Sequence, residues 1–145
     1  MNKLNLAMTI GALTFASNVF AASVIDLYKS PSCGCCTEWA EIMQQKGYEV
    51  KTHQQQSWNE VKSSHGLTPD LVSCHSAVID GYLIEGHVPE ADIARLLKEK
   101  PKGVKGLAAP GMPQHSPGMA APGVAYQGFD VIAFGEKGQS VYASY

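Results

Sequence analysis

Basic residues are scarce in this sequence of 145 residues. Lysine and arginine total 11 against 13 acidic residues, Arg95 is the only arginine, and the formal net charge is −2. Proteins that bind nucleic acid neutralise its phosphates with a basic face, which this composition does not supply. The sequence also lacks a Ser/His/Asp order, a phosphate-binding loop and a convincing carboxylate pair, so it assigns no catalytic residues.

Long apolar runs are absent except at the start of the chain. Lys3 precedes a mostly apolar stretch from Leu4 to Phe20, followed by Ala21, which is the pattern of a secretory signal peptide. An uncleaved anchor would need a longer apolar stretch. We therefore predict that residues 1–21 are a signal peptide and that residues 22–145 form one exported domain with no remaining membrane span.

The periodicity of the remaining chain predicts an α/β domain with a thioredoxin-like mixed sheet and flanking helices. Alternating patterns predict strands and 3.6-residue patterns predict helices. Asp80-Gly81 predicts a type I′ hairpin turn, because both positions accept positive φ. In chain order, the predicted elements are a strand at 23–28, a helix at 37–46, a strand at 48–52, a helix from Ser57 to Gly66, strands at 76–79 and 82–85, and a helix at 89–100.

Two further segments are predicted as additions to this core. Residues 103–123 are rich in Gly, Pro, Ala and Met without periodicity, which predicts a long functional or mobile loop. Residues 129–134 and 140–145 predict a closing β-hairpin. In the helix that starts at Ser57, Glu60 stands three residues after the predicted N-cap and would complete a capping box.

Three of the four cysteines lie within four residues, at Cys33, Cys35 and Cys36. A disulfide that only staples a fold links distant segments, so this cluster indicates chemistry. Its position at the start of a predicted helix favours thiolates, which serve both as nucleophiles and as metal ligands. Thiol–disulfide exchange needs just Cys33 and Cys36, whereas metal binding also gives Cys35 a purpose.

The closeness of these three thiols favours several bridged ions over one tetrahedral zinc. Soft thiolates favour Cu(I), with zinc or an iron–sulfur cluster as the other options. Cys74 directly precedes a predicted strand, at the position where thioredoxin-like proteins approach the Cys-x-x-Cys turn, and we expect it to face the cluster. If that segment is already extended, the neighbouring His75 would point away from Cys74, and a ligand role for it is doubtful. His87 ends the predicted hairpin and is interpreted as a residue that orients the loop.

The long loop carries further soft ligands. Met112 and Met119 each follow a glycine, and His115 lies between them. Thioethers bind Cu(I) without deprotonation and cannot be lost to disulfides. The alternative is that both methionines fill apolar gaps under the loop. Beside a thiolate cluster, we favour a copper contact for all three residues.

These motifs resemble those of the CopG-like copper-resistance proteins, which are exported bacterial proteins. The segments that carry the resemblance are residues 28–36, 73–77, 85–89 and 106–113, and the similarity extends over essentially the whole chain after the signal peptide. The resemblance implies a thioredoxin-like fold, a periplasmic location and a multinuclear Cu(I)–thiolate cluster. Its ligands here would be Cys33, Cys35, Cys36 and Cys74.

The resemblance leaves the use of the copper open. Storage, transfer to other periplasmic copper carriers or efflux proteins, and redox conversion all fit a copper-tolerance protein. The main alternative function is a thiol–disulfide oxidoreductase in which Cys33 attacks and Cys36 resolves. A structural zinc module is the third hypothesis, and it predicts unfolding when the metal is removed.

Overall fold

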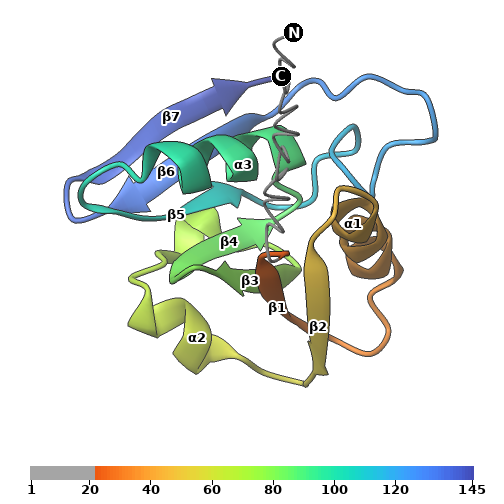
Figure 1. The fold of residues 1–145 in the computed structure, drawn as a ribbon, viewed down its shortest axis with the longest axis horizontal. Helices are drawn as coiled ribbons and strands as arrows, with labels where there is room; N and C mark the ends of the chain where they lie inside the picture. The colour runs from red at the N-terminus through yellow and green to blue at the C-terminus, as the bar shows by residue number, and fades with distance from the viewer. Residues whose placement is uncertain (1–21) are drawn as a thin grey trace, which may run out of the picture.

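Seven strands form one mixed sheet in the computed structural model, which describes residues 22–145 (Figure 1). The predicted signal peptide therefore lies outside the described residues. The strands follow the spatial order β2-β1-β3-β4-β5-β6-β7. Their bounds are β1 (Val24–Lys29), β2 (Glu49–Gln54), β3 (His75–Ile79), β4 (Tyr82–Gly86), β5 (Val104–Ala109), β6 (Asp130–Gly135) and β7 (Gly138–Ser144).

Three α-helices and one short 3-10 helix connect these strands. They are α1 (Gly34–Gln45), α2 (Asn59–Ser64), η1 (Pro69–Leu71) and α3 (Glu90–Glu99). The parallel pair β1/β2 is joined by α1 and the parallel pair β4/β5 by α3, while β1/β3 and β3/β4 are antiparallel. The predicted α/β class with a mixed sheet and flanking helices is confirmed, and the thioredoxin-like description of it stays a prediction.

The two faces of the sheet bury separate apolar clusters. Trp39 and Met43 of α1 and Ile93 and Leu96 of α3 are fully buried in the larger cluster. Leu71 of η1 belongs to the smaller cluster on the opposite face, against which α2 also packs. This division follows from strand alternation, because neighbouring residues of β3 and β4 point to opposite faces. None of the helices described in residues 22–145 is long and apolar enough to cross a membrane.

Both predicted hairpins are present. In the turn between β3 and β4, Asp80 has φ of 48° and Gly81 has φ of 82°, as a type I′ turn requires. The C-terminal hairpin of β6 and β7 is paired antiparallel and extends the sheet at its far edge (Figure 1). The long loop of residues 110–129 runs from β5 to β6 and passes over α1.

The prediction that residues 103–123 form one loop is wrong at its start, where β5 lies. Leu107 and Ala109 are buried in the larger cluster and Ala108 in the smaller one. A strand that is covered on both faces carries apolar residues at successive positions, so the alternation that marks a half-exposed strand is missing. β5 also needs a glycine at position 106, because a Cβ there would overlap the carbonyl of Leu83 in the neighbouring strand β4.

The capping box predicted at Ser57 is also wrong. The N-cap of α2 is Trp58, and no side chain caps this helix. The indole Nε1 of Trp58 instead donates a hydrogen bond to Ser76 Oγ at 3.0 Å, and the ammonium of Lys62 lies 5.6 Å from the ring centroid. Tertiary contacts of the tryptophan therefore set where the helix begins, and the local capping signal does not.

Candidate metal centre

The cysteine motif occupies the N-terminus of α1. Cys33 is the N-cap, and the helix begins at Gly34, three residues before its predicted start, so that Cys35 and Cys36 lie in the first turn. No acidic residue lies in that turn and no side chain caps it. The free N–H groups and the helix dipole therefore favour negative charge on these sulfurs. Cys36 is fully buried, whereas Cys33 and Cys35 are partly exposed.

Cys74 reaches the same place from the other side, immediately before β3. Its Sγ lies 3.6 Å from the Sγ of Cys36, and the Sγ atoms of Cys33 and Cys35 are also 3.6 Å apart. All four sulfurs lie within 4.8 Å of one another. The structure thus brings together the four cysteines that the sequence grouped.

Two of these four sulfurs are joined in a Cys33–Cys36 disulfide, and Cys35 and Cys74 are free thiols. Each sulfur of the disulfide consequently has a free cysteine beside it. Four thiolate ligands become available only when two electrons reduce this bond.

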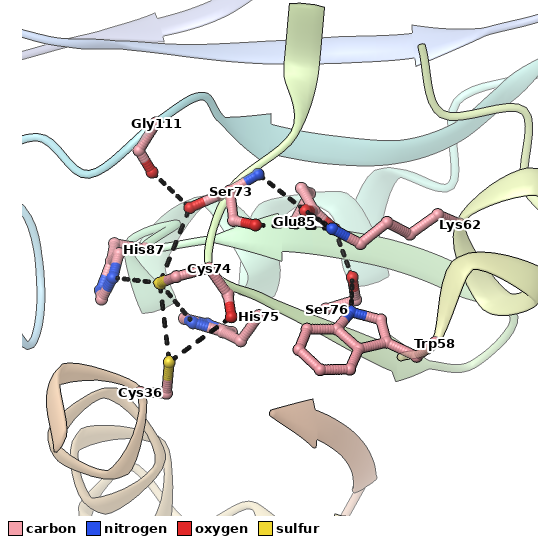
Figure 2. A network of polar contacts seen from close by, with 10 residues as sticks. All are labelled: Cys36, Trp58, Lys62, Ser73, Cys74, His75, Ser76, Glu85, His87 and Gly111. Atoms are coloured by element: carbon pink, nitrogen blue, oxygen red, sulfur yellow. Dashed lines mark hydrogen bonds and ion pairs between the residues drawn. The ribbon is translucent and has the colours of Figure 1, made fainter. Parts of the chain in front are cut away.

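Two histidines complete the surroundings of Cys74. His75 Nδ1 lies 3.6 Å and His87 Nε2 3.1 Å from the Cys74 Sγ, and the three residues form a second group of possible ligands (Figure 2). The expectation that His75 points away from Cys74 depended on an extended segment, and that condition is not met. Cys74 lies in a bend before the strand, so the alternation of an extended segment does not apply between these two residues.

The loop fixes the orientation of His87. Its Nδ1 lies 2.7 Å from the carbonyl oxygen of Pro117. A carbonyl can only accept, so Nδ1 carries the proton and Nε2 is left as an acceptor for the Cys74 S–H. His87 thus contacts the loop, and the interpretation that His87 orients the loop stays a prediction.

Burial sets the protonation states around Cys74. It lowers the pKa of His75 well below its ordinary value, helped by the neighbouring His87. Burial also lowers the pKa of His87, against an opposing effect of its bond to Pro117. Both imidazoles are therefore neutral at pH 7, the form that binds metals. Burial, with a further contribution from Cys35, raises the pKa of Cys74 to about 11, so this thiol must lose its proton to bind a metal.

The loop carrying Met112, His115 and Met119 touches the site through its backbone. Ser73 Oγ bonds the carbonyl of Gly111, and a Cβ on Gly118 would lie 2.7 Å from the carbonyl oxygen of Cys35. Met112 is 56% exposed, His115 is exposed and Met119 is partly buried. In the described part of the chain, His115 is not among the clustered nitrogen, sulfur and carboxylate ligands.

A buried charged network supports the segment that carries Cys74 (Figure 2). Glu85 of β4 is fully buried and accepts hydrogen bonds from the Ser73 backbone N–H at 2.8 Å, from Lys62 Nζ at 2.8 Å and from Ser76 Oγ. Burial raises the pKa of Glu85, and its three donors oppose that shift. The network joins α2, β4 and the residue next to Cys74.

Comparisons with known proteins show which family this chain resembles. The family model described as "Protein of unknown function, DUF411" matches residues 71–119. Two solved structures described as "Copper resistance protein copG", Form 1 and Form 2, are each 36% identical to the chain and cover 86% of it. The matches span 98% of the first and 99% of the second, with TM-scores of 0.78 and 0.77. The chain belongs to the CopG family. No curated protein matches it.

In this CopG-family chain, the sequence did not reveal that two histidine nitrogens lie beside the Cys74 sulfur, or that a charged network lies behind it. The matched residues 71–119 contain Cys74, His75, Glu85 and His87 and end at Met119. A glutamate inside an otherwise apolar strand was the available signal for a buried charge at Glu85. Its partner Lys62 comes from a separate helix, and no local pattern connects the two.

Proposed function

We propose that the protein binds Cu(I) through the thiolates of Cys33, Cys35, Cys36 and Cys74 as a cluster of more than one copper ion, and that it serves in copper tolerance. The observation that carries this proposal is the convergence of the four sulfurs within 4.8 Å. So many soft ligands in one place favour Cu(I) over harder ions. Cys35 and Cys36 are adjacent on one helical turn, so their sulfurs suit bridging between ions better than chelation of one.

The cellular setting is part of the same proposal. We place the protein in the periplasm as a single domain of residues 22–145, released from the signal peptide of residues 1–21. The relatives of known structure are described as copper resistance proteins, which supports a role in copper handling. Other periplasmic copper carriers or efflux proteins are the proposed partners.

Met112, Met119 and His115 are proposed to cover the cluster or to pass copper on. The loop that carries them already contacts the site at Ser73, and a thioether needs no deprotonation to take up Cu(I). The exposed Met112 is suited to a first encounter with copper from solvent.

The deciding experiment counts copper and thiols. The protein is purified anaerobically with reductant and supplied with Cu(I), and bound copper and free thiols are then measured per chain. We expect two or more coppers with all four thiols protected. The Cys35→Ser variant should bind fewer coppers and still form the Cys33–Cys36 disulfide, whereas Ser32→Ala, an exposed change in the same turn, should bind as many as the unchanged protein. Unchanged copper binding by Cys35→Ser would contradict the cluster.

Thiol–disulfide oxidoreductase activity is the second candidate function. The disulfide between the partly exposed Cys33 and the buried Cys36 favours it. One site can combine the two functions, because a disulfide that oxidises two Cu(I) ions to Cu(II) gains two electrons and becomes two thiolates. Turnover of a disulfide substrate that survives Cys35→Ser and ignores copper chelators would favour the oxidoreductase alone.

A further inference from the structure

The disulfide in this structure has a third cysteine positioned at its buried end. Cys36 is fully buried, so a nucleophile from solvent can approach the bond only at Cys33. Inside the protein, the Cys74 Sγ lies 3.6 Å from the Cys36 Sγ. Thiol–disulfide exchange by Cys33 and Cys36 alone does not involve Cys74.

Cys74 also has a base within hydrogen-bond reach, which acts against the burial that raises the pKa of its thiol (Figure 2). His87 Nε2 lies 3.1 Å from its sulfur, and the other ring nitrogen of His87 is held by the carbonyl of Pro117 at 2.7 Å. A nucleophile bonded to a base, which is oriented in turn by a third group, is the arrangement that activates cysteines in enzymes. The fixed orientation keeps the basic nitrogen of His87 directed at Cys74.

We propose that Cys74 moves the disulfide inward, from Cys33–Cys36 to Cys36–Cys74. All four sulfurs lie within 4.8 Å of one another, so the Cys74 sulfur must first move into line with the Cys33–Cys36 bond. His87 Nε2 takes the proton of the Cys74 thiol, and the thiolate attacks the Cys36 sulfur. A Cys36–Cys74 bond forms, the Cys33–Cys36 bond breaks, and its electron pair leaves with Cys33 as a thiolate. No electron enters or leaves the protein, so the exchange needs no oxidant, reductant or metal.

The site favours departure of Cys33 in particular. Exchange is faster when the leaving thiolate is more stable, and Cys33 is the N-cap of α1, where free backbone N–H groups and the helix dipole stabilise negative charge. The product stores the disulfide between Cys36 and Cys74 and frees Cys33, the partly exposed cysteine of the original pair. This activity goes beyond copper binding and operates in the metal-free protein.

Peptide mapping tests the exchange. Cys35→Ser removes the other free thiol, and the oxidised, metal-free variant is incubated with iodoacetamide, quenched in acid and digested with trypsin. Cleavage at lysine and arginine separates residues 30–46, which contain Cys33 and Cys36, from residues 63–95, which contain Cys74. We expect these two peptides to become disulfide-linked through Cys36 and Cys74 as Cys33 is alkylated. The Cys35→Ser/Cys74→Ser variant should keep the original disulfide.

A persistent Cys33–Cys36 bond, with Cys74 either alkylated or untouched, would overturn the proposal. The contribution of His87 is tested in the same Cys35→Ser background. His87→Gln should slow formation of the linked peptides by about 100-fold, the lower range for a general base. His53→Gln, a histidine paired with Asp26 away from the site, should leave the rate within about twofold of its parent.

Folding of the His87 variant is checked by its thermal unfolding, and His87→Asn replaces it if it does not fold. Equal rates in the folded His87 variant and its parent would show that Cys74 needs no base. Because the experiment uses metal-free protein, its failure leaves the copper proposal standing, and failure of copper binding leaves this result unaffected.

Discussion

Glu85 and Lys62 form an ion pair inside the protein, beside the segment that carries Cys74. The side chain of Glu85 is 0% exposed and that of Lys62 is 14% exposed, with 2.8 Å between Oε1 and Nζ. Lys62 Nζ also lies 3.4 Å from the Ser73 carbonyl, and the Ser73 N–H donates to Glu85. Both polar groups of the Ser73 backbone are thereby held by this pair. We infer that the pair positions Cys74 in addition to filling the interior.

Removal of both members of this pair should cost less than the sum of the two single removals. Glu85→Gln leaves the Lys62 ammonium without its counter-charge, and breaking a buried pair in this way costs about 3 kcal/mol of unfolding free energy. The double variant Lys62→Met/Glu85→Gln leaves no buried charge at this position. We therefore expect its loss to be at least about 1 kcal/mol smaller than the sum of the single losses, as measured by urea denaturation.

The surface pair of Lys51 and Glu49 is a matched comparison. Its atoms are 3.8 Å apart and both side chains are 57% exposed. Glu49→Gln should change the unfolding free energy by less than about 1 kcal/mol. Strict additivity at Lys62 and Glu85 would contradict the coupling.

At the scale of elements, the contact between the long loop and α1 depends on one glycine. Gly118 has φ of +83°, and a Cβ there would lie 2.7 Å from the Cys35 carbonyl oxygen and 2.8 Å from the Trp39 nitrogen. The loop backbone thus rests directly on the helix that presents the cysteines. Its neighbour Pro117 holds His87 in the same contact region.

We predict that Gly118→Ala loosens the loop from α1. Gly123 is the matched control, because its φ is +80° and a Cβ there meets nothing within 4 Å. Both substitutions carry the strain of a positive φ, roughly 1 kcal/mol. Only Gly118→Ala adds a clash with the helix backbone, which costs a further ~1–3 kcal/mol. Chemical denaturation of both variants measures this difference, and equal losses would show that the loop yields without cost.

For the whole molecule, the sequence was sufficient to predict most of the fold. Alternation identified β1 and β2, and the Asp80-Gly81 turn identified the central hairpin of β3 and β4. These signals are local, because each reflects one face of one element. The sequence did not predict β5, because both faces of this strand are covered. It did not predict the N-cap of α2, because Trp58 forms a hydrogen bond with a residue of β3.

The site, like the fold, was predictable only where local sequence patterns or the predicted fold determine it. The grouping of Cys74 with Cys33 and Cys36 followed from the predicted thioredoxin-like arrangement, in which the segment before this strand lies against the Cys-x-x-Cys turn. In the structure the start of β3 pairs with the end of β1. The direction of His75 depended on the bend at Cys74, and the link between Lys62 and Glu85 depended on where α2 packs. Neither feature produces a periodic pattern in the sequence, so only the three-dimensional arrangement reveals them.

The stability of the whole molecule should fall at alkaline pH, because two tyrosines tie separate parts of the chain to α3. Tyr48 donates to Glu90 at 3.2 Å, and Tyr145 at the C-terminus donates to Asp92 at 2.7 Å. Burial, and then the charge and hydrogen bond of Glu90, raise the pKa of Tyr48 from 10.0 to about 12. Burial and the bond to Asp92 raise the pKa of Tyr145 as well.

Each neutral hydroxyl is stabilised in the folded state, so it ionises at higher pH there than in the unfolded chain. This stabilisation is complete below pH 10 and is lost as the pH rises toward about 12, the raised pKa of Tyr48. The Tyr48→Phe/Tyr145→Phe variant should therefore be less stable at pH 8, with a shallower decline of unfolding free energy between pH 10 and 12. Tyr126→Phe, which keeps its ring contact with Tyr145, is the control and should decline like the unchanged protein. If the double variant declines in parallel with that control, the two hydroxyls are not the source of the alkaline loss.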